Sequence, residues 1–148
     1  LRRQFDFVRN DQFALKEIKI SNDPNDQDDL LLDKHKILIE SRFDVLSPEV
    51  SHIAYHVLNE SGEPIFSMGT MDIELSMGEN KITCEIPAYF FQSGTYYLSL
   101  FVISKSQKAL LIEKDVMSFL VTDGDRLMGA YMGREPGDIR PQFNWYRS

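Results

Sequence analysis

Cysteine and long apolar runs are scarce in this chain. A single cysteine, Cys84, occurs among 148 residues, so no disulfide can form within the chain. Such a domain belongs either in a reducing compartment or to a class that folds without disulfides. No apolar run approaches the roughly 20 residues that a membrane-spanning helix needs, and no signal peptide is recognisable. We therefore expect no direct insertion into a membrane.

Basic residues are outnumbered by acidic ones. The chain has 16 lysines and arginines against 23 aspartates and glutamates, which gives a formal net charge of -7. Proteins that bind nucleic acids depend on lysine and arginine to neutralise phosphates, and no long basic stripe occurs in this sequence. Nucleic acid is therefore not expected as a partner.

Patterns of catalytic or metal-binding residues are lacking as well. His52 and His56 share one face of a predicted strand but would lie roughly 13 Å apart, too far to bind one metal ion. Residues 23–29 resemble a calcium-binding loop in their alternating polar residues, but the glycine and the final glutamate of an EF-hand are missing. No spacing of Ser, His and Asp and no pair of cleft carboxylates indicates a hydrolase. We expect no enzyme activity, no metal and no cofactor.

What the chain does have is a strong period-two pattern. Hydrophobic residues make up 43% of it, enough for one domain with a sizeable core. The alternation predicts strands at about residues 13–21, 34–45, 50–58, 65–70, 80–86 and 96–103, followed by one or two strands within 109–121. A phase change indicates a bulge near Lys16 and Glu17, whereas residues 72–77 fit either a helical turn or a loop. We predict an all-β, immunoglobulin-like or jelly-roll antiparallel β-sandwich of seven or eight strands.

The strand that begins near Tyr96 has the clearest alternation. One set of its residues is expected to face the core and the other to face outward, and the two sets are Tyr96, Leu98, Leu100 and Val102 against Tyr97, Ser99 and Phe101. Gly94 followed two residues later by Tyr96 is similar to the tyrosine corner of immunoglobulin-like sandwiches. In that motif the phenol hydroxyl is hydrogen-bonded to upstream backbone. We expect Tyr96 to have this structural role.

The last part of the chain differs from the rest. We expect residues 1–121 to form the sandwich and residues 122–148 to form a tail, in which glycines and prolines interrupt any regular element. The tail also carries large apolar side chains, which are atypical of a disordered segment and must be buried. They would pack either on the same sandwich or, by strand exchange, on a second copy in a homodimer.

Four segments carry a resemblance to a known family. These are the turn from Asn59 to Pro64 followed by Ile65-Phe66, the turn from Gln92 to Tyr97, the strand Phe119-Leu120-Val121, and the tail that ends in Arg140-Pro141-Gln142-Phe143-Asn144-Trp145. Together they resemble the C-terminal carbohydrate-binding domain of Wzt, the nucleotide-binding subunit of ABC transporters that export O-antigen polysaccharide. The resemblance implies a non-catalytic domain that recognises the O-polysaccharide, often at its non-reducing end, and that dimerises by exchange of its C-terminal strand.

The resemblance also implies a cellular setting. The chain begins at Leu1 without a methionine, so we expect it to be part of a longer polypeptide. It has no G-x-x-x-x-G-K-[ST] motif, and the ATPase domain implied by the resemblance would lie outside it. Through that missing domain, the protein would associate with the membrane transporter subunit at the cytoplasmic face of the inner membrane.

The predicted strand faces suggest where a glycan would bind. The third predicted strand and the Tyr96 strand share a sheet in immunoglobulin-like order, and their outward residues include the predicted ligand-binding set His52, His56, Tyr97, Ser99 and Phe101. Tyr97 and Phe101 would offer ring faces to sugar C–H groups, and the other three would supply hydrogen bonds to hydroxyls.

The same outward aromatics permit another interpretation. A ring on the outer face of a strand can be covered by a loop, by the tail or by a second protein. The alternative function is therefore a structural protein-protein interaction module with no glycan ligand.

Overall fold

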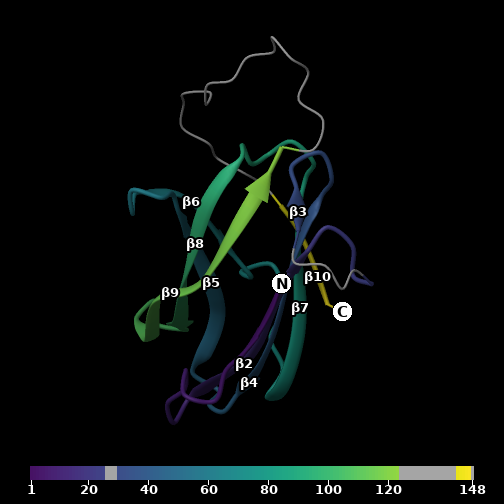
Figure 1. The fold of residues 1–148 in the computed structure, drawn as a ribbon. Coiled ribbons are helices and arrows are strands. Elements are labelled where there is room, and N and C mark those ends of the chain that lie inside the picture. The colour runs from purple at the N-terminus through teal and green to yellow at the C-terminus, as the bar shows by residue number, and fades with distance from the viewer. Residues whose placement is uncertain (26–29, 124–142, 148) are drawn as a thin grey trace.

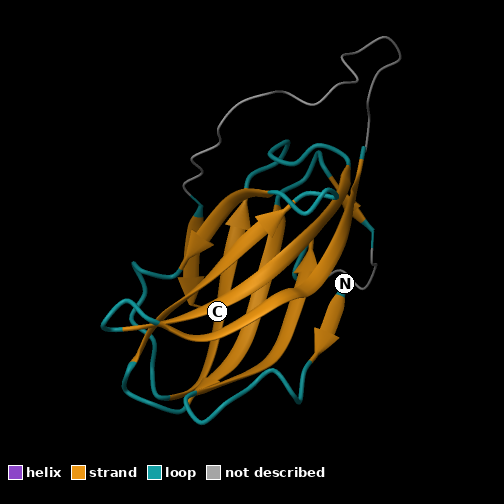
Figure 2. Ribbon diagram, turned by 90° about the vertical axis from the view of Figure 1, so that its left-hand side faces the viewer, coloured by secondary structure: helices purple, strands orange, loops and turns teal. Residues whose placement is uncertain are grey.

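The chain folds into two β-sheets packed face to face. The computed structural model describes residues 1–25, 30–123 and 143–147, and all regular elements in these ranges are strands. The strands are β1 (Arg2–Gln4), β2 (Phe13–Ser21), β3 (Leu31–Leu32), β4 (Ile37–Val45), β5 (Val50–Leu58), β6 (Pro64–Gly69), β7 (Gly78–Ile86), β8 (Gly94–Ser104), β9 (Ala109–Thr122) and β10 (Asn144–Arg147). Figures 1 and 2 show the two layers. The predicted all-β sandwich is confirmed.

Each sheet has five strands. Sheet A has the order β1-β2-β4-β7-β10 and sheet B the order β3-β9-β8-β5-β6. The neighbouring strands are antiparallel except β3 and β9, which run parallel. The seven long strands were predicted from the sequence, whereas β1, β3 and β10 have two to four residues each and are too short to show alternation. Residues 109–122 form one long strand, and residues 72–77 contain turns and no helix.

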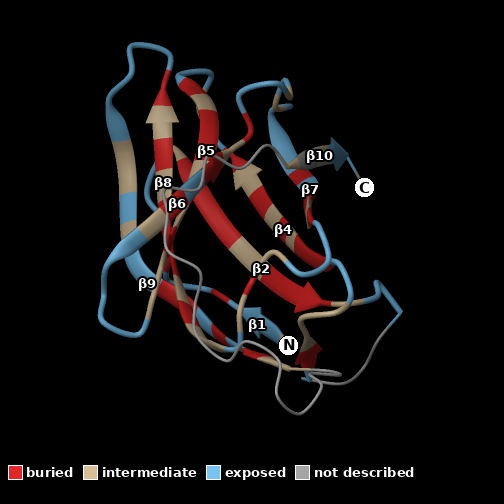
Figure 3. Cartoon of the chain, turned by 90° about the horizontal axis from the view of Figure 1, so that it is seen from above, coloured by how far each residue is buried: buried red, intermediate tan, exposed pale blue. Residues whose placement is uncertain are grey.

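The core lies between the sheets, where the inward side chains of both interdigitate. Figure 3 shows buried residues alternating with less buried ones along the strands. Near the centre, the Tyr55 hydroxyl of β5 lies 2.7 Å from the Ser41 hydroxyl of β4, which links the two sheets. Burial raises the pKa of the Tyr55 phenol well above its ordinary value, so the hydroxyl stays neutral.

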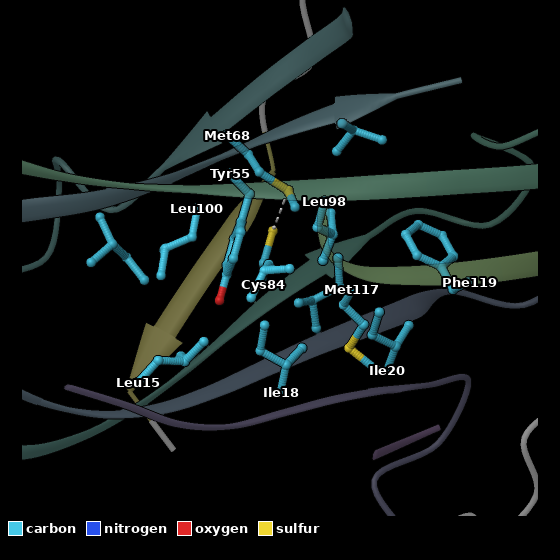
Figure 4. Close-up of a cluster of buried hydrophobic side chains, with 14 of the residues drawn as sticks. Leu15, Ile18, Ile20, Tyr55, Met68, Cys84, Leu98, Leu100, Met117 and Phe119 are labelled. Atoms are coloured by element: carbon cyan, nitrogen blue, oxygen red, sulfur yellow. Dashed lines mark hydrogen bonds between the residues drawn. The ribbon is translucent and has the colours of Figure 1, made fainter. Parts of the chain in front are cut away.

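Cys84 is part of the same core. Its sulfur lies 3.7 Å from the Met68 sulfur, and its side chain is fully buried (Figure 4). Burial, with a smaller contribution from Glu85, raises the pKa of the Cys84 thiol. Because a thiolate is the reactive form of cysteine, Cys84 acts as a small core residue.

The predicted tyrosine corner and bulge are both present. Tyr96 donates a hydrogen bond from its hydroxyl to the Gln92 carbonyl at 2.7 Å, and its ring packs against Phe91 at 4.6 Å between centroids. The register of β2 against β4 shifts between Leu15 and Glu17, at the position that the change of phase predicted. The corner and the bulge help to fix the register of their strands, and the register determines which residues face outward.

The described part of the tail packs on the sandwich of its own chain. β10 pairs antiparallel with β7, and the Phe143 ring meets Phe66 and Phe90 with centroids 5.5 and 5.0 Å apart. Trp145 packs, partly buried, against the core. Residues 124–142, which belong to the predicted tail, lie outside the described residues.

Replacing Tyr96 by Phe should lower the free energy of unfolding by about 1 to 3 kcal/mol, because the partly buried Gln92 carbonyl loses its donor. Urea denaturation followed by fluorescence measures this change. Tyr97→Phe is the matched control, since its ring is on the outer face, and it should change stability by less than about 0.5 kcal/mol. Equal losses in the two variants would contradict the corner's role.

The hydrogen bond between Tyr55 and Ser41 can be tested with a double-mutant cycle. Tyr55→Phe and Ser41→Ala should each lower the free energy of unfolding by about 1 to 3 kcal/mol, because each leaves the other residue's buried hydroxyl without its partner. The double variant should cost less than the sum, with a coupling energy of about 1 kcal/mol. Strict additivity in chemical denaturation would show that the two hydroxyls do not stabilise each other.

Candidate functional site

The outer faces of the two sheets have different chemistry. The outer face of sheet B carries rings and apolar side chains, and we call the surface formed by His56, Tyr97, Phe101, Ile112, Ser118 and Leu120 the aromatic face. The outer face of sheet A carries alternating cations and carboxylates joined by ion pairs across the strands. Inward positions are mostly apolar on both sheets, so the difference arises from the outward residues.

The centre of the aromatic face is a stacked pair of rings. His56 of β5 and Phe101 of β8 have centroids 4.1 Å apart and ring planes 29° from parallel. Phe101 is opposite Ala54 in the ladder, and His56 is opposite Ser99. The rings are therefore diagonal neighbours, and small partners lie directly across from each. Both residues are of intermediate burial, so part of each remains accessible to solvent.

Tyr97 extends this platform along β8. It lies two residues from Ser99 and four from Phe101 on the same face, about 13 Å from Phe101 along the strand. Its ladder partners are Leu58 on β5 and Ser118 on β9, and its ring is half-buried. A ring and a hydroxyl on one side chain can meet both the apolar and the polar parts of a ligand.

Two β9 residues that the sequence analysis did not include complete the aromatic face. Ile112, opposite Phe101, is 49% exposed, and Leu120, opposite Thr95, is 58% exposed. For Leu120 the sequence did carry a signal: Ser118 and Leu120 alternate with the buried Phe119 and Val121, which places Leu120 on the outer face. No such signal existed for Ile112, because a bulge changes the phase of β9 between these two parts of the strand.

Two of the five predicted site residues are nearly enclosed. Ser99 is 5% exposed, and its hydroxyl accepts a hydrogen bond from the Asp115 backbone N–H at 3.1 Å. Asp115 has a φ of 52° at the β9 bulge, so Ser99 helps to hold an unusual backbone conformation. Little of the Ser99 side chain is left for a ligand.

His52 is the other enclosed residue. It is 8% exposed, and its Nδ1 lies 3.2 Å from the Ser51 hydroxyl. Burial lowers the pKa of His52, because desolvation disfavours the charged imidazolium. The structure thus places all five residues on one sheet face, where His56, Tyr97 and Phe101 are partly accessible and His52 and Ser99 are nearly enclosed.

The described residues contain no group of three or more His, Cys, Asp or Glu side chains that could hold a metal ion. Within the same ranges, no helix has the length and apolar character needed to cross a membrane. The aromatic face presents aromatic rings, hydroxyls, one imidazole and the apolar side chains of Ile112 and Leu120.

Comparison with known proteins bears on the fold. The structure is similar to a crystal structure of the C-terminal domain of Wzt, with a TM-score of 0.65 over 87% of this chain and 81% of that chain. The two sequences are 13% identical over this match, which is a likeness of fold alone. No family model and no curated protein matches the sequence. The resemblance predicted from the sequence is confirmed in structure: this chain has the fold of the Wzt C-terminal domain.

Proposed function

We propose that this chain is a non-catalytic carbohydrate-binding domain that recognises an O-antigen polysaccharide for export by an ABC transporter. Two observations support the proposal: the fold similarity to the C-terminal domain of Wzt, and the aromatic face. Fold similarity alone does not decide function, so the proposal depends mainly on the partly accessible stack of His56 and Phe101 on a rigid sheet.

The aromatic face has the chemistry that sugars need. The C–H groups of a pyranose ring form an apolar patch that packs on an aromatic ring, while its hydroxyls need donors and acceptors. Phe101 and Tyr97 supply ring faces, and His56, Tyr97 and Ser118 supply polar groups around them. We assign Ser99 a structural role, because its hydroxyl accepts a hydrogen bond from the β9 backbone, and His52 is nearly enclosed beside Ser51 of the same strand.

The sheet contributes rigidity to this site. Phe101 and His56 project from β8 and β5, which are central strands of sheet B and pair along most of their length. Side chains on paired strands lose less freedom on binding than side chains on loops, so less of the contact energy is offset by ordering. A small stacking surface can therefore still bind the end of a polysaccharide. We place the non-reducing end of the glycan on the aromatic face.

The assembly follows from the same proposal. We propose a homodimer formed through the C-terminal tail, an ATPase domain outside this chain that attaches it to the membrane transporter subunit, and a location at the cytoplasmic face of the inner membrane. β10 forms its ladder with β7, and the same ladder can form with β7 of a second copy.

One observation favours a second candidate function. Ile112 and Leu120 are exposed apolar side chains on the aromatic face, and such groups also occur at protein-protein interfaces. Under this alternative the domain is a structural interaction module, and the rings are buried against another protein.

Calorimetric titration with O-polysaccharide from the source organism tests the glycan proposal. Tyr97→Ala and Phe101→Ala should each weaken binding about tenfold or more, because each removes a stacking surface. A tenfold loss corresponds to about 1.4 kcal/mol of binding free energy. Tyr89→Ala is the matched control, since Tyr89 is a 73% exposed tyrosine in the loop before β8. Unchanged affinity in both face variants, with melting temperatures near that of the native chain, would exclude the aromatic face. Lack of any binding by the native chain would favour the interaction module.

The dimer proposal has its own measurement. Light scattering coupled to size-exclusion chromatography should give the mass of two copies for the full chain, and the mass of one copy after deletion of residues 123–148. The deletion removes β10 together with the Phe143 and Trp145 contacts, so circular dichroism should accompany it to show that the sandwich is retained. A full chain with the mass of one copy would contradict the proposal.

A further inference from the structure

The outer face of sheet A contains a groove that the glycan proposal does not use. Its volume is about 590 Å³, and residues of β1, β2, β4 and β7, with the loop after β2, line it. The charged lining residues are Arg2, Lys19, Arg42, Lys81, Glu17 and Glu40. This volume falls within the usual range for sites that bind small molecules.

The groove is locally cationic in an acidic protein. Four cationic side chains and two carboxylates line it, whereas the whole chain has a formal net charge of -7. Clusters of like charge in a concave surface raise the local concentration of the opposite ion. The groove therefore differs in sign from the average surface of the molecule.

Three of the four cations lie at the surface, and the carboxylates are less exposed. The Arg2, Arg42 and Lys81 side chains are 54%, 40% and 52% exposed. The Glu17 and Glu40 side chains are only 16% and 15% exposed. A ligand that enters from solvent meets the guanidinium and ammonium groups first.

The buried carboxylates orient these cations without occupying their hydrogen-bond donors. Glu17 lies 3.6 Å from Arg2 Nε and 3.9 Å from Arg42 Nη2, and Glu40 lies 3.7 Å from Lys81 Nζ. These distances exceed the 2.7–3.2 Å of an ordinary N–H···O hydrogen bond. The ion pairs hold the side chains near one another. The fork of Arg2 can still bond an anion in bidentate geometry, and that of Arg42 can do so when the anion displaces Glu79, to which Arg42 Nη1 donates at 3.3 Å.

Two further contacts complete the lining. Lys19 is 8% exposed, and its ammonium donates to the Pro24 carbonyl at 2.6 Å, which holds that charge in place in the groove wall. At the rim, Glu79 Oε1 lies 3.3 Å from Arg42 Nη1, and its side chain is 61% exposed. Glu79 therefore competes with any anion for Arg42.

We propose that this groove binds the anionic group, phosphate or carboxylate, of a small soluble ligand the size of one or two sugar rings. Arg2 and Arg42 contact the anion, and Lys81 and Lys19 add positive charge. The site lies on the opposite sheet from the aromatic face, so it goes beyond the proposed function and does not depend on it.

Titration of the full chain with three probes tests the proposal. Glucose 6-phosphate and glucuronate should bind, glucose should not, and binding should weaken at least fivefold between 50 and 500 mM NaCl. Vesicles of phosphatidylglycerol distinguish a lipid headgroup from a soluble anion. Binding to vesicles without binding to either soluble anion, or equal binding of glucose, would overturn the proposal.

Matched variants locate the site. Arg42→Gln and Arg2→Gln should each weaken glucose 6-phosphate binding about tenfold. Lys36→Gln should not, because Lys36 is a 52% exposed cation on the same sheet face, paired with Glu85, and lies outside the groove. Glu79→Gln should strengthen binding twofold or more, a gain that a loss of structure cannot produce. Equal loss in Lys36→Gln, or weaker binding in Glu79→Gln, would overturn the assignment.

One variant separates this proposal from the glycan proposal. Tyr97→Ala removes part of the aromatic face and should bind glucose 6-phosphate with native affinity, because Tyr97 projects from the other sheet. Loss of glucose 6-phosphate binding in a folded Tyr97→Ala protein would place the anion on the aromatic face and overturn the groove assignment.

Discussion

The hydrogen bond between the Tyr55 and Ser41 hydroxyls determines more of this structure than its own strength suggests. It joins β5 of one sheet to β4 of the other inside an otherwise apolar core, where an unpartnered hydroxyl would be costly. If either strand slipped by one residue, that hydroxyl would point to solvent and its partner would remain buried alone. With Tyr55 directed inward, its neighbour His56 must face outward, and with Ser41 inward, Arg42 must face outward. This buried contact thus acts together with the apolar inward residues of β4 and β5 to fix the phase of one strand in each candidate surface.

This constraint helps to determine which side chains form the outer face of each sheet, but the side chains of the two faces are held in place in different ways. On sheet B, the stacked rings of His56 and Phe101 lie on central strands, so their positions depend on backbone ladders more than on side-chain contacts. On sheet A, the cations are held by carboxylates on neighbouring strands, such as Glu17 of β2 beside Arg42 of β4. The first arrangement suits a neutral ligand that stacks, because its rings can exchange contacts with water for contacts with the ligand. The second suits an anion, because its cations can exchange water for the charged oxygens of the ligand.

Alternation predicted strand phase, and immunoglobulin-like order placed β5 and β8 in one sheet, but neither showed which strands are neighbours in sheet A. Alternation identified the inward set of β8 and the outward positions of Tyr97 and Phe101, because each strand carries its own pattern. It could not show that β2, β4 and β7 are neighbours, so the ion pairs that link Glu17, Arg42 and Glu79 could not be predicted. Nor could it show that Ser99, although outward in phase, is covered at the β9 bulge near Asp115, since that burial depends on the neighbouring strand. The short strand β10 was also beyond pattern reasoning, because its four residues are too few to show a period.

The separation of inner and outer residues also explains how a fold persists at 13% identity. Inward positions such as Ile53 and Val57 need only be apolar and of suitable volume, so many sequences satisfy them. Outward positions such as His56 and Phe101 contribute little to the core and can change with small effects on stability. Two sandwiches of this kind can therefore share their layers and differ completely in what their faces recognise. It follows that ligand identity must be read from the outward residues of this chain, because the common fold supplies a rigid support whatever the ligand.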